Sequence, residues 1–317
     1  MGSRRRKIWT DHHRQWLGYL TGLLQHVQSG RKIPLGPSEP SPQLATKIPA
    51  VLKPLRIAYC APHPDDESLS GALALRLQLE TGARVTVVAI TLGRDEGQRQ
   101  RRLRELESAC SALGFDLVVP NAPHSMEEVT LPSRQNRRAL WLRHRKMLQM
   151  AFEEIHPDLV FAPHHDDFNS THIGTHYLVV DALRQYLAQK KQHAVMLAET
   201  EIWHQMNGPN LMVGIAPETV AIQLVAACEH AGEMLRNPYH ILHACRLMDN
   251  VRRGSEVVGG QGAAAQPFSF AELYRISFVA GNKVVAAKPG GQMVGPEDPL
   301  DFALLKKWFW PGSGKVQ

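Results

Sequence analysis

The strongest indication of chemistry is the segment 61–67, which reads Ala-Pro-His-Pro-Asp-Asp-Glu. An imidazole and a carboxylate three residues apart on a turn, His63 and Asp66, can both face one cation. The intervening Asp65 then points elsewhere, so its carboxylate stays free for another task. A structural alternative is that Asp65 or Asp66 caps a helix that begins near Ser68. We favour the metal site, because a helix cap requires neither a histidine nor a second aspartate.

A second group of histidines and aspartates lies at 164–172, which reads His-His-Asp-Asp-Phe-Asn-Ser-Thr-His. Scattered histidines usually belong to surfaces or hydrogen-bonded cores, but four within thirteen residues at one strand end indicate a site. His172 and His176 would share one face of a helix, as in zincin motifs. We favour His172 alone as the third ligand. It lies nearer the strand end, and three protein ligands leave one position of a catalytic zinc open for water.

Both groups follow apolar runs that have the composition of buried strands, at 55–61 and 158–163. The alternation of strands and helices predicts an α/β fold, a Rossmann-like doubly wound and mainly parallel sheet with helices on both faces. In the common order 3-2-1-4-5 the first and fourth strands are neighbours, so the two motifs would meet at the crevice between their carboxyl ends. The remaining predicted strands are 84–91, 116–120 and 194–200, and the predicted helices are 68–79, 98–113, 134–155, 173–187 and 217–234.

Three parts are predicted along the chain. Residues 1–50 would form an N-terminal extension, with a helix at 8–27 and a proline-rich linker behind it. Residues 51–200 would form the Rossmann-like zinc-binding catalytic core, and residues 201–317 would complete the substrate pocket within the same domain. The glycine-rich stretch 254–262 is predicted to be a loop over or beside the site.

The composition excludes several classes of protein. No apolar run approaches the about 18 residues of a membrane span, and no apolar segment follows Arg4–Lys7 as a signal peptide requires. Four scattered cysteines indicate neither a disulfide framework nor a thiolate zinc site, so a reducing, cytoplasmic location is expected. The formal charge is +6, but the basic run 99–104 lies beside Glu105 and Glu107 and is interpreted as a solvated helix face. No nucleic-acid partner is expected, and the oligomeric state stays open.

On these motifs the sequence resembles the PIG-L/LmbE-like family of zinc-dependent N-acetylglucosaminyl deacetylases. The hallmark of that family is a strand ending in (A/P)HPDDE and a later histidine in a loop after the fourth strand. The resemblance extends over about 55–275. It includes Thr91-Leu92-Gly93, Arg102 with Glu105, and Glu201-Ile202-Trp203. The HPDDE motif is specific, whereas each of the other matches is weak by itself.

The resemblance implies that zinc binds to His63, Asp66 and His172 and that Asp65 is the general base. One departure concerns the general acid. The family often has His-Pro-Asp-His at the second motif, whereas this chain has Asn-Ser-Thr-His at 169–172. The replacements for the missing acid and its partner are sought among His164, His165, Asp166 and Asp167, with His164 and His165 as the expected catalytic residues.

Three residues are expected to contact the substrate. Arg102 is part of the resemblance, and Trp203 offers a ring that can stack on a sugar, although packing in the core is the ordinary role of a tryptophan. His230 resembles a late histidine of the family that reaches the substrate or the oxyanion. A position on a helix surface is the equally weighted alternative for His230.

We therefore expect an enzyme that hydrolyses an amide bond, removing the N-acetyl or another N-acyl group from an amino sugar or its conjugate. A small-molecule N-acetylated amino sugar or glycoconjugate is the expected partner. A zinc phosphoesterase is one alternative, although two-metal sites usually need more bridging carboxylates than these motifs supply. The other is a catalytically silent sugar-binding module, because a fold does not guarantee a reaction.

Overall fold

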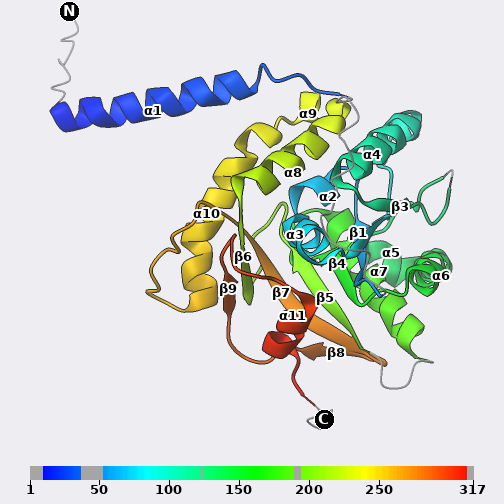
Figure 1. Ribbon diagram of the computed structural model, residues 1–317. Coiled ribbons are helices and arrows are strands. Elements are labelled where there is room, and N and C mark those ends of the chain that lie inside the picture. Colours follow the sequence, from blue (N-terminus) through cyan, green and yellow to red (C-terminus); the bar gives the residue numbers. More distant parts are fainter. Residues whose placement is uncertain (1–9, 37–52, 123, 189–193, 313–317) are drawn as a thin grey trace, which may run out of the picture.

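The five apolar runs predicted as strands form five neighbouring strands of a nine-stranded sheet (Figure 1). The computed structural model describes residues 10–36, 53–122, 124–188 and 194–312. The strands are β1 Arg56–Ala61, β2 Arg84–Ala89, β3 Asp116–Val118, β4 Leu159–Pro163, β5 Ala194–Thr200, β6 Leu211–Ile215, β7 Phe270–Ala280, β8 Lys283–Ala286 and β9 Gln292–Val294.

The strand order is β3-β2-β1-β4-β5-β7-β6-β9, and β8 pairs with β7. Strands β1 to β5 are parallel, whereas β7 is antiparallel to β5 and to β6. The chain leaves β1 for β2 on one side and later returns to β4 on the other side. The crevice between the carboxyl ends of β1 and β4 is therefore the topological switch point of the sheet. The predicted fold class and the neighbouring positions of these two strands are confirmed.

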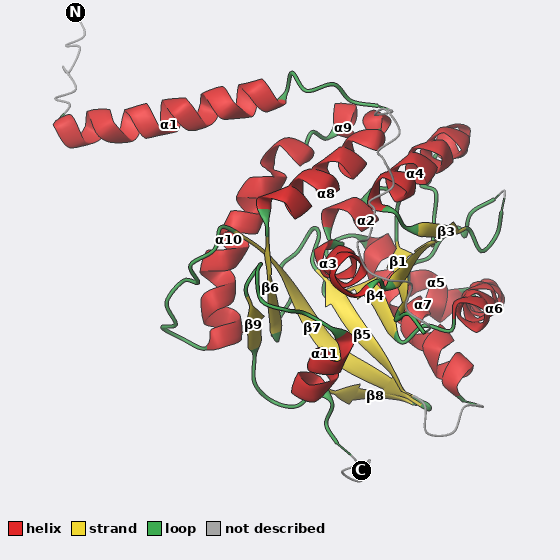
Figure 2. Cartoon of the chain, in the orientation of Figure 1, coloured by secondary structure: helices red, strands yellow, loops and turns green. Residues whose placement is uncertain are grey.

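Helices cover both faces of the sheet (Figure 2). The helices are α1 Asp11–Gly30, α2 Asp66–Leu69, α3 Ala72–Thr81, α4 Arg99–Leu113, α5 Leu131–Asn136, α6 Arg138–Ile155, α7 Ser170–Leu187, α8 Pro217–Glu229, α9 Ala231–Arg236, α10 His240–Gly259 and α11 Phe302–Phe309. Side chains of β1 alternate between two cores: Tyr59 packs in the core with α3 and α4, and Cys60 packs in the core with α6 and α7.

Three predicted helices are each divided in two. The helix predicted at 68–79 breaks at Ser70 and Gly71, where a Cβ on Gly71 would lie 2.3 Å from the carbonyl oxygen of Glu67. The segments predicted at 134–155 and 217–234 also form two helices each, α5 with α6 and α8 with α9. Periodicity shows that a segment is helical, but it does not reveal a short change of direction.

The prediction of a loop at 254–262 is wrong for most of that stretch, because α10 continues to Gly259. A Cβ on Gly254 would lie 2.6 Å from the side chains of both Leu273 and Met212. This glycine allows α10 to approach β6 and β7 closely, so it serves packing and not flexibility. Of the described helices, none is both long and apolar enough to cross a bilayer.

Candidate active site

The HPDDE segment forms the turn between β1 and α2, at the carboxyl edge of the sheet. Asp65 has φ 123°, a strained conformation for a residue other than glycine, and it makes no side-chain capping bond to α2. The Asp66 Oδ2 atom accepts a hydrogen bond from the backbone N–H of His63 at 2.9 Å. The turn thus holds Asp66 toward His63 and turns Asp65 away from both, and the capping alternative finds no support at Asp65.

The structure brings His63, Asp66 and His172 together. The His63 Nδ1 atom lies 3.2 Å from His172 Nε2 and 3.5 Å from Asp66 Oδ2, and the latter two atoms are 3.3 Å apart. Four ligand atoms arranged tetrahedrally about 2.0–2.1 Å from zinc are separated by about 3.3–3.4 Å. Two imidazole nitrogens and a carboxylate oxygen at these separations match one face of such a tetrahedron, so the residues present fit a metal ion.

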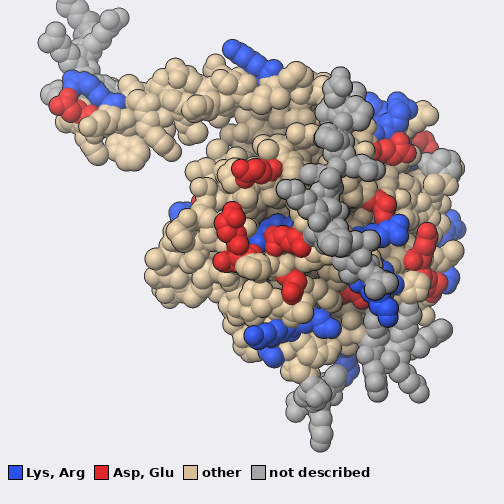
Figure 3. Space-filling view, viewed as in Figure 1, with Lys and Arg blue, Asp and Glu red and all other residues tan. Residues whose placement is uncertain are grey.

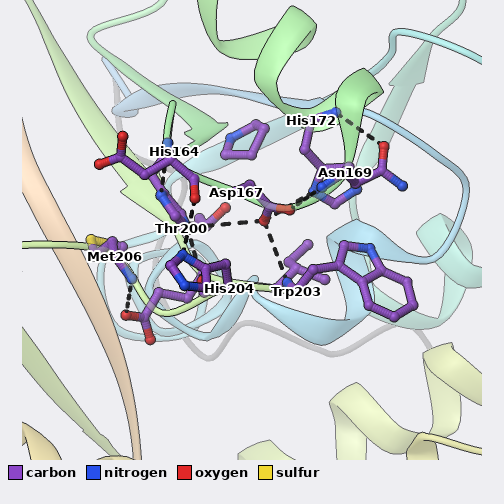
Figure 4. A network of polar contacts seen from close by, with 12 residues as sticks. His164, Asp167, Asn169, His172, Thr200, Trp203, His204 and Met206 are labelled. Atoms are coloured by element: carbon purple, nitrogen blue, oxygen red, sulfur yellow. Dashed lines mark hydrogen bonds and ion pairs between the residues drawn. The ribbon is translucent and has the colours of Figure 1, made fainter.

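A second carboxylate stands behind the His172 ring (Figure 4). The Asp167 Oδ2 atom lies 3.5 Å from His172 Nδ1, and both side chains are fully buried. Asp167 is held in turn by the backbone N–H groups of Asn169, at 2.9 Å, and Trp203, at 3.4 Å. A carboxylate on the outer nitrogen of a ligating histidine fixes its tautomer and orientation, as second-shell partners of metal sites do.

The charge balance at this point favours a cation. Burial opposes a charge on His172, but the carboxylates of Asp66 and Asp167 outweigh it and raise the pKa of His172 to about 10. Burial also opposes the charge on Asp66, yet His172 and His63 hold the pKa of Asp66 well below its usual range. Two buried carboxylates thus require positive charge between them, which a proton on His172 or a divalent cation supplies.

Asp65 lies beside this group and makes a different set of contacts. Its Oδ2 atom accepts a hydrogen bond from the hydroxyl of Tyr239, and its backbone N–H donates to Glu67 Oε2 at 3.0 Å. Burial, and after it the charge of Asp66, raises the pKa of Asp65 to about 8. A carboxyl group with such a pKa can exchange a proton near neutral pH, which is the property of a general acid or base.

A cavity of about 340 Å³ opens over these residues. Its walls come from the turn after β1, the loop after β2, the segment after β5, and helices α9 and α10. The lining residues include His63, Asp65, Asp66, Gly93, Arg94, Arg102, Asn169, Trp203, Glu233, Arg236, Tyr239, Leu242, His243 and Arg246.

The three predicted substrate contacts have different positions. Arg102 and Trp203 both line the cavity; the Arg102 guanidinium donates to the Pro64 carbonyl at 3.2 Å, and Trp203 is 53% exposed at the mouth. His230 does not line it. It is buried, and its Nε2 atom lies 2.7 Å from Glu67 Oε1. This pair supports the turn that carries Asp65, because Glu67 also accepts from the Asp65 backbone.

Neither histidine expected as the acid reaches the cavity. The His164 ring is fully buried, with Nε2 2.9 Å from the His204 carbonyl and Nδ1 accepting from the backbone of Asp166 (Figure 4). Burial lowers the pKa of His164. His165 points into a separate cavity of about 770 Å³, where the Arg275 guanidinium donates to its Nδ1 atom at 3.0 Å.

His165, His176 and Glu199 form a second group with the residue types of a metal site. The Arg275 guanidinium makes two hydrogen bonds to Glu199, at 2.6 and 2.8 Å. The charge of this carboxylate is therefore already balanced, unlike that of Asp66. His176 belongs to this group and not to the one formed by His63, Asp66 and His172.

Sequence reasoning missed the cavity wall formed by α9 and α10. Tyr239, at the start of α10, contacts Asp65 across 174 positions of sequence. His243 and Arg246 follow one and two turns later on the same helix, and all three line the cavity. No motif marks these residues, and only the heptad-like spacing 239, 243 and 246 indicates that they share a helix face.

Residues 59–183 match the model of the PIG-L family, which is described as GlcNAc-PI de-N-acetylase. The matched segment contains His63, Asp65, Asp66 and His172, whereas Trp203 and helices α9 and α10 lie outside it. The match confirms the resemblance that the motifs indicated, and it supports the expected class of enzyme, a hydrolase that acts on the amide bond of an N-acetylated sugar. No curated protein sequence matches the chain.

Solved structures share the fold at low sequence identity. The N,N'-diacetylchitobiose deacetylase from Pyrococcus horikoshii has a TM-score of 0.51 at 16% identity, over 86% of this chain and 94% of that one. A conserved protein from Thermus thermophilus has a TM-score of 0.52 at 19% identity, over 69% and 93%. The 4-carboxy-2-hydroxymuconate hydratase from Pseudomonas putida has a TM-score of 0.51 at 17% identity, over 71% and 96%. A deacetylase and a hydratase thus share this fold, so the reaction must be argued from the site.

Proposed function

We propose that this protein is a zinc-dependent amidohydrolase that removes the N-acetyl group from an amino sugar or its conjugate. The observation that carries the proposal is the convergence of His63, Asp66 and His172 at tetrahedral spacing, with Asp65 beside them on the floor of a cavity. Zinc held by these three residues would act as a Lewis acid, which polarises an acyl carbonyl and lowers the pKa of water.

Asp65 moves the proton in this proposal. It accepts a proton from the attacking water and then delivers it to the nitrogen of the leaving amine. The Tyr239 hydroxyl orients the carboxylate through its hydrogen bond to Oδ2. A single residue is assigned both tasks because His164 is hydrogen-bonded away from the cavity and His165 faces the other cavity.

The cavity suits a sugar with a polar rim. Trp203 offers an exposed ring at the mouth for the apolar face of a pyranose, while Arg94, Arg102 and Asn169 offer donors to its hydroxyl groups. A two-metal phosphoesterase is not favoured, since the two groups of ligand-type side chains found among the described residues share no carboxylate that could bridge two metal ions. The cytoplasm stays our proposed location, supported by the four free cysteines.

The test is a screen of N-acetylglucosamine, its glycosides and its phosphorylated conjugates with zinc-loaded protein, together with Asp65→Asn as the matched inactive variant. We expect free primary amine and acetate in equal amounts from at least one substrate. The Asp65→Asn protein should release far less of both. Release of phosphate without amine would replace the proposal with a phosphoesterase, and sugar binding with no product would replace it with a binding module.

A further inference from the structure

Helix α1 is an arm that leaves the body of the molecule (Figure 1). Only its end approaches α10, and the segment after it is fastened to the body by the hydrogen bond from the Gly36 N–H to the Cys228 carbonyl at 3.1 Å. No residue of α1 is buried. The helix therefore does not serve to fill the core.

One side of α1 is apolar and faces solvent. Trp16, Leu20, Leu23, Leu24 and Val27 recur at helical spacing, and Leu17 and Tyr19 flank them. At 100° per residue these seven side chains cover an arc of about 160°. The largest of them are strongly exposed: Trp16 is 56% accessible, Tyr19 61% and Leu24 62%. An exposed apolar face of this size indicates a surface that is covered in use.

The charge of the chain points to what covers this face. Residues 1–50 contain eight Lys or Arg and two Asp or Glu, whereas residues 51–317 contain 28 of each. The extension alone therefore carries the formal charge of +6. The basic residues flank the apolar face, with Arg4–Lys7 before the helix and Arg31 and Lys32 after it. Between Arg14 and Arg31 the sequence has no Asp, Glu, Lys or Arg, and the face of the helix visible in Figure 3 is uncharged there.

We propose that the N-terminal extension docks the protein on an anionic lipid bilayer, with the apolar face of α1 inserted at the level of the headgroups. A basic amphipathic helix with Trp, Tyr and Leu on its apolar side has the composition of an interfacial helix. A second copy of this chain is a poorer partner, because its body carries no net charge that would complement the extension. A nucleic acid would complement the charge but would leave the apolar face uncovered.

The docked orientation has a consequence for the active site. The segment after α1 packs through Leu35 against the cluster of Leu69, Ala227 and Met234, which also contacts Tyr239. Helices α9 and α10, which form one wall of the cavity, are therefore next to the point where α1 is attached. Leu242 lines the cavity and is 55% exposed on the same helix. The bilayer would then lie beside the mouth of the cavity.

The experiment is sedimentation of the full chain with vesicles of phosphatidylcholine alone and with 30% phosphatidylserine. We expect the protein to bind the anionic vesicles. Binding to neutral vesicles should be much weaker, and 0.5 M salt should weaken the binding to anionic vesicles.

The variant Leu20→Glu/Leu24→Glu should bind the anionic vesicles more than ~10-fold less tightly, since it places two charges in the apolar face. The variant Thr21→Glu/Gln25→Glu adds the same charge on the opposite side and keeps every apolar side chain, so its loss of affinity should be at least ~10-fold smaller than that of Leu20→Glu/Leu24→Glu. Replacing Arg4, Arg5, Arg6 and Lys7 by Gln should lower the affinity for anionic vesicles more than ~10-fold.

Several results would overturn the proposal. The first is that the wild-type protein does not sediment with anionic vesicles. The second is that it binds neutral vesicles as tightly as anionic ones, and the third is that the two double variants lose the same affinity. A dimer that Leu20→Glu/Leu24→Glu dissociates, without any vesicle binding, would identify a second copy as the partner. Duplex binding without vesicle binding would identify a nucleic acid. Melting temperatures of all variants establish that they are folded, and none of these measurements depends on the proposed enzymatic activity.

Discussion

The proposed chemistry depends most directly on Asp65. Its carboxylate lies beside the three metal ligands but is not itself a ligand, so it is free to take up a proton. Asp65→Asn keeps the size of the side chain and the bond from Tyr239, but it cannot take up the proton. We expect normal zinc content and turnover that is slower by about 10²–10⁴-fold. Zinc content, melting temperature and amine release are measured on one preparation. Unchanged turnover with zinc bound would show that another group is the base.

The ligand assignment is also decided at single residues. His63→Ala, Asp66→Ala and His172→Ala each remove one of three donors that lie within 3.5 Å of one another, so each variant should lose most of its metal. His176→Ala is the matched control. His176 lies one helical turn after His172, but its ring faces Glu199, so this variant should keep nearly all of its zinc. Metal analysis of the purified variants tests this. If the His172→Ala protein kept all of its zinc and the His176→Ala protein contained none, the assignment would be reversed.

At the scale of the element, the first turn of α7 positions His172. Asn169 is its N-cap, and the Asn169 Oδ1 atom accepts from the backbone N–H of Thr171 at 2.8 Å and of His172 at 3.4 Å. Asn169→Ala should lower the free energy of unfolding by about 1 kcal/mol and should also weaken zinc binding. Thr130→Ala removes the cap of α5 and is the matched control: it should cost similar stability without affecting the metal. Urea unfolding and a zinc titration measure the two effects. Equal zinc affinity in both variants would show that the cap only stabilises the helix.

The two strand ends explain why a short motif suffices for the site. The β1–α2 turn supplies His63 and Asp66, and the start of α7 supplies His172, because β1 and β4 are adjacent and parallel. The strained backbone at Asp65 separates its carboxylate from that of Asp66, which keeps two neighbouring aspartates in different roles. The ends of two adjacent strands thus bring together ligands that a single longer sequence motif would otherwise have to supply.

At the scale of the whole molecule, the extension and the body are expected to be separable. Deletion of residues 1–30 removes only the contact between the end of α1 and α10 and leaves Leu35 and Gly36 in place, so zinc content, melting temperature and turnover on a small soluble substrate should change little. Deletion of residues 1–41 also removes Leu35 from its contact with Leu69, Ala227 and Met234, and should cost about 1 kcal/mol of stability. Unfolding curves of the two truncated proteins test this. Loss of turnover after the shorter deletion, with the fold intact, would show that α1 contributes to the site.

The sequence by itself was sufficient for the order of strands β1 to β5 and of the helical segments between them, for the fold class and for the grouping of His63, Asp66 and His172. These features are encoded locally: apolar periodicity distinguishes strands from helices, and a three-residue spacing on a turn brings two ligands to one side. Right-handed crossovers then leave few arrangements of five parallel strands, so the meeting of two strand ends could be predicted as well.

Only the tertiary structure decided which other polar groups belong to the site. His164 and His165 are adjacent to the motif in sequence, yet one is turned toward His204 and the other toward Arg275. Tyr239 is 174 positions from Asp65 and bonds to it, because α10 packs closely on the sheet at Gly254 and carries its first turns over the cavity. The direction of a side chain beyond a strand end depends on the hydrogen-bond partners that distant segments bring to it, and no local pattern encodes those partners.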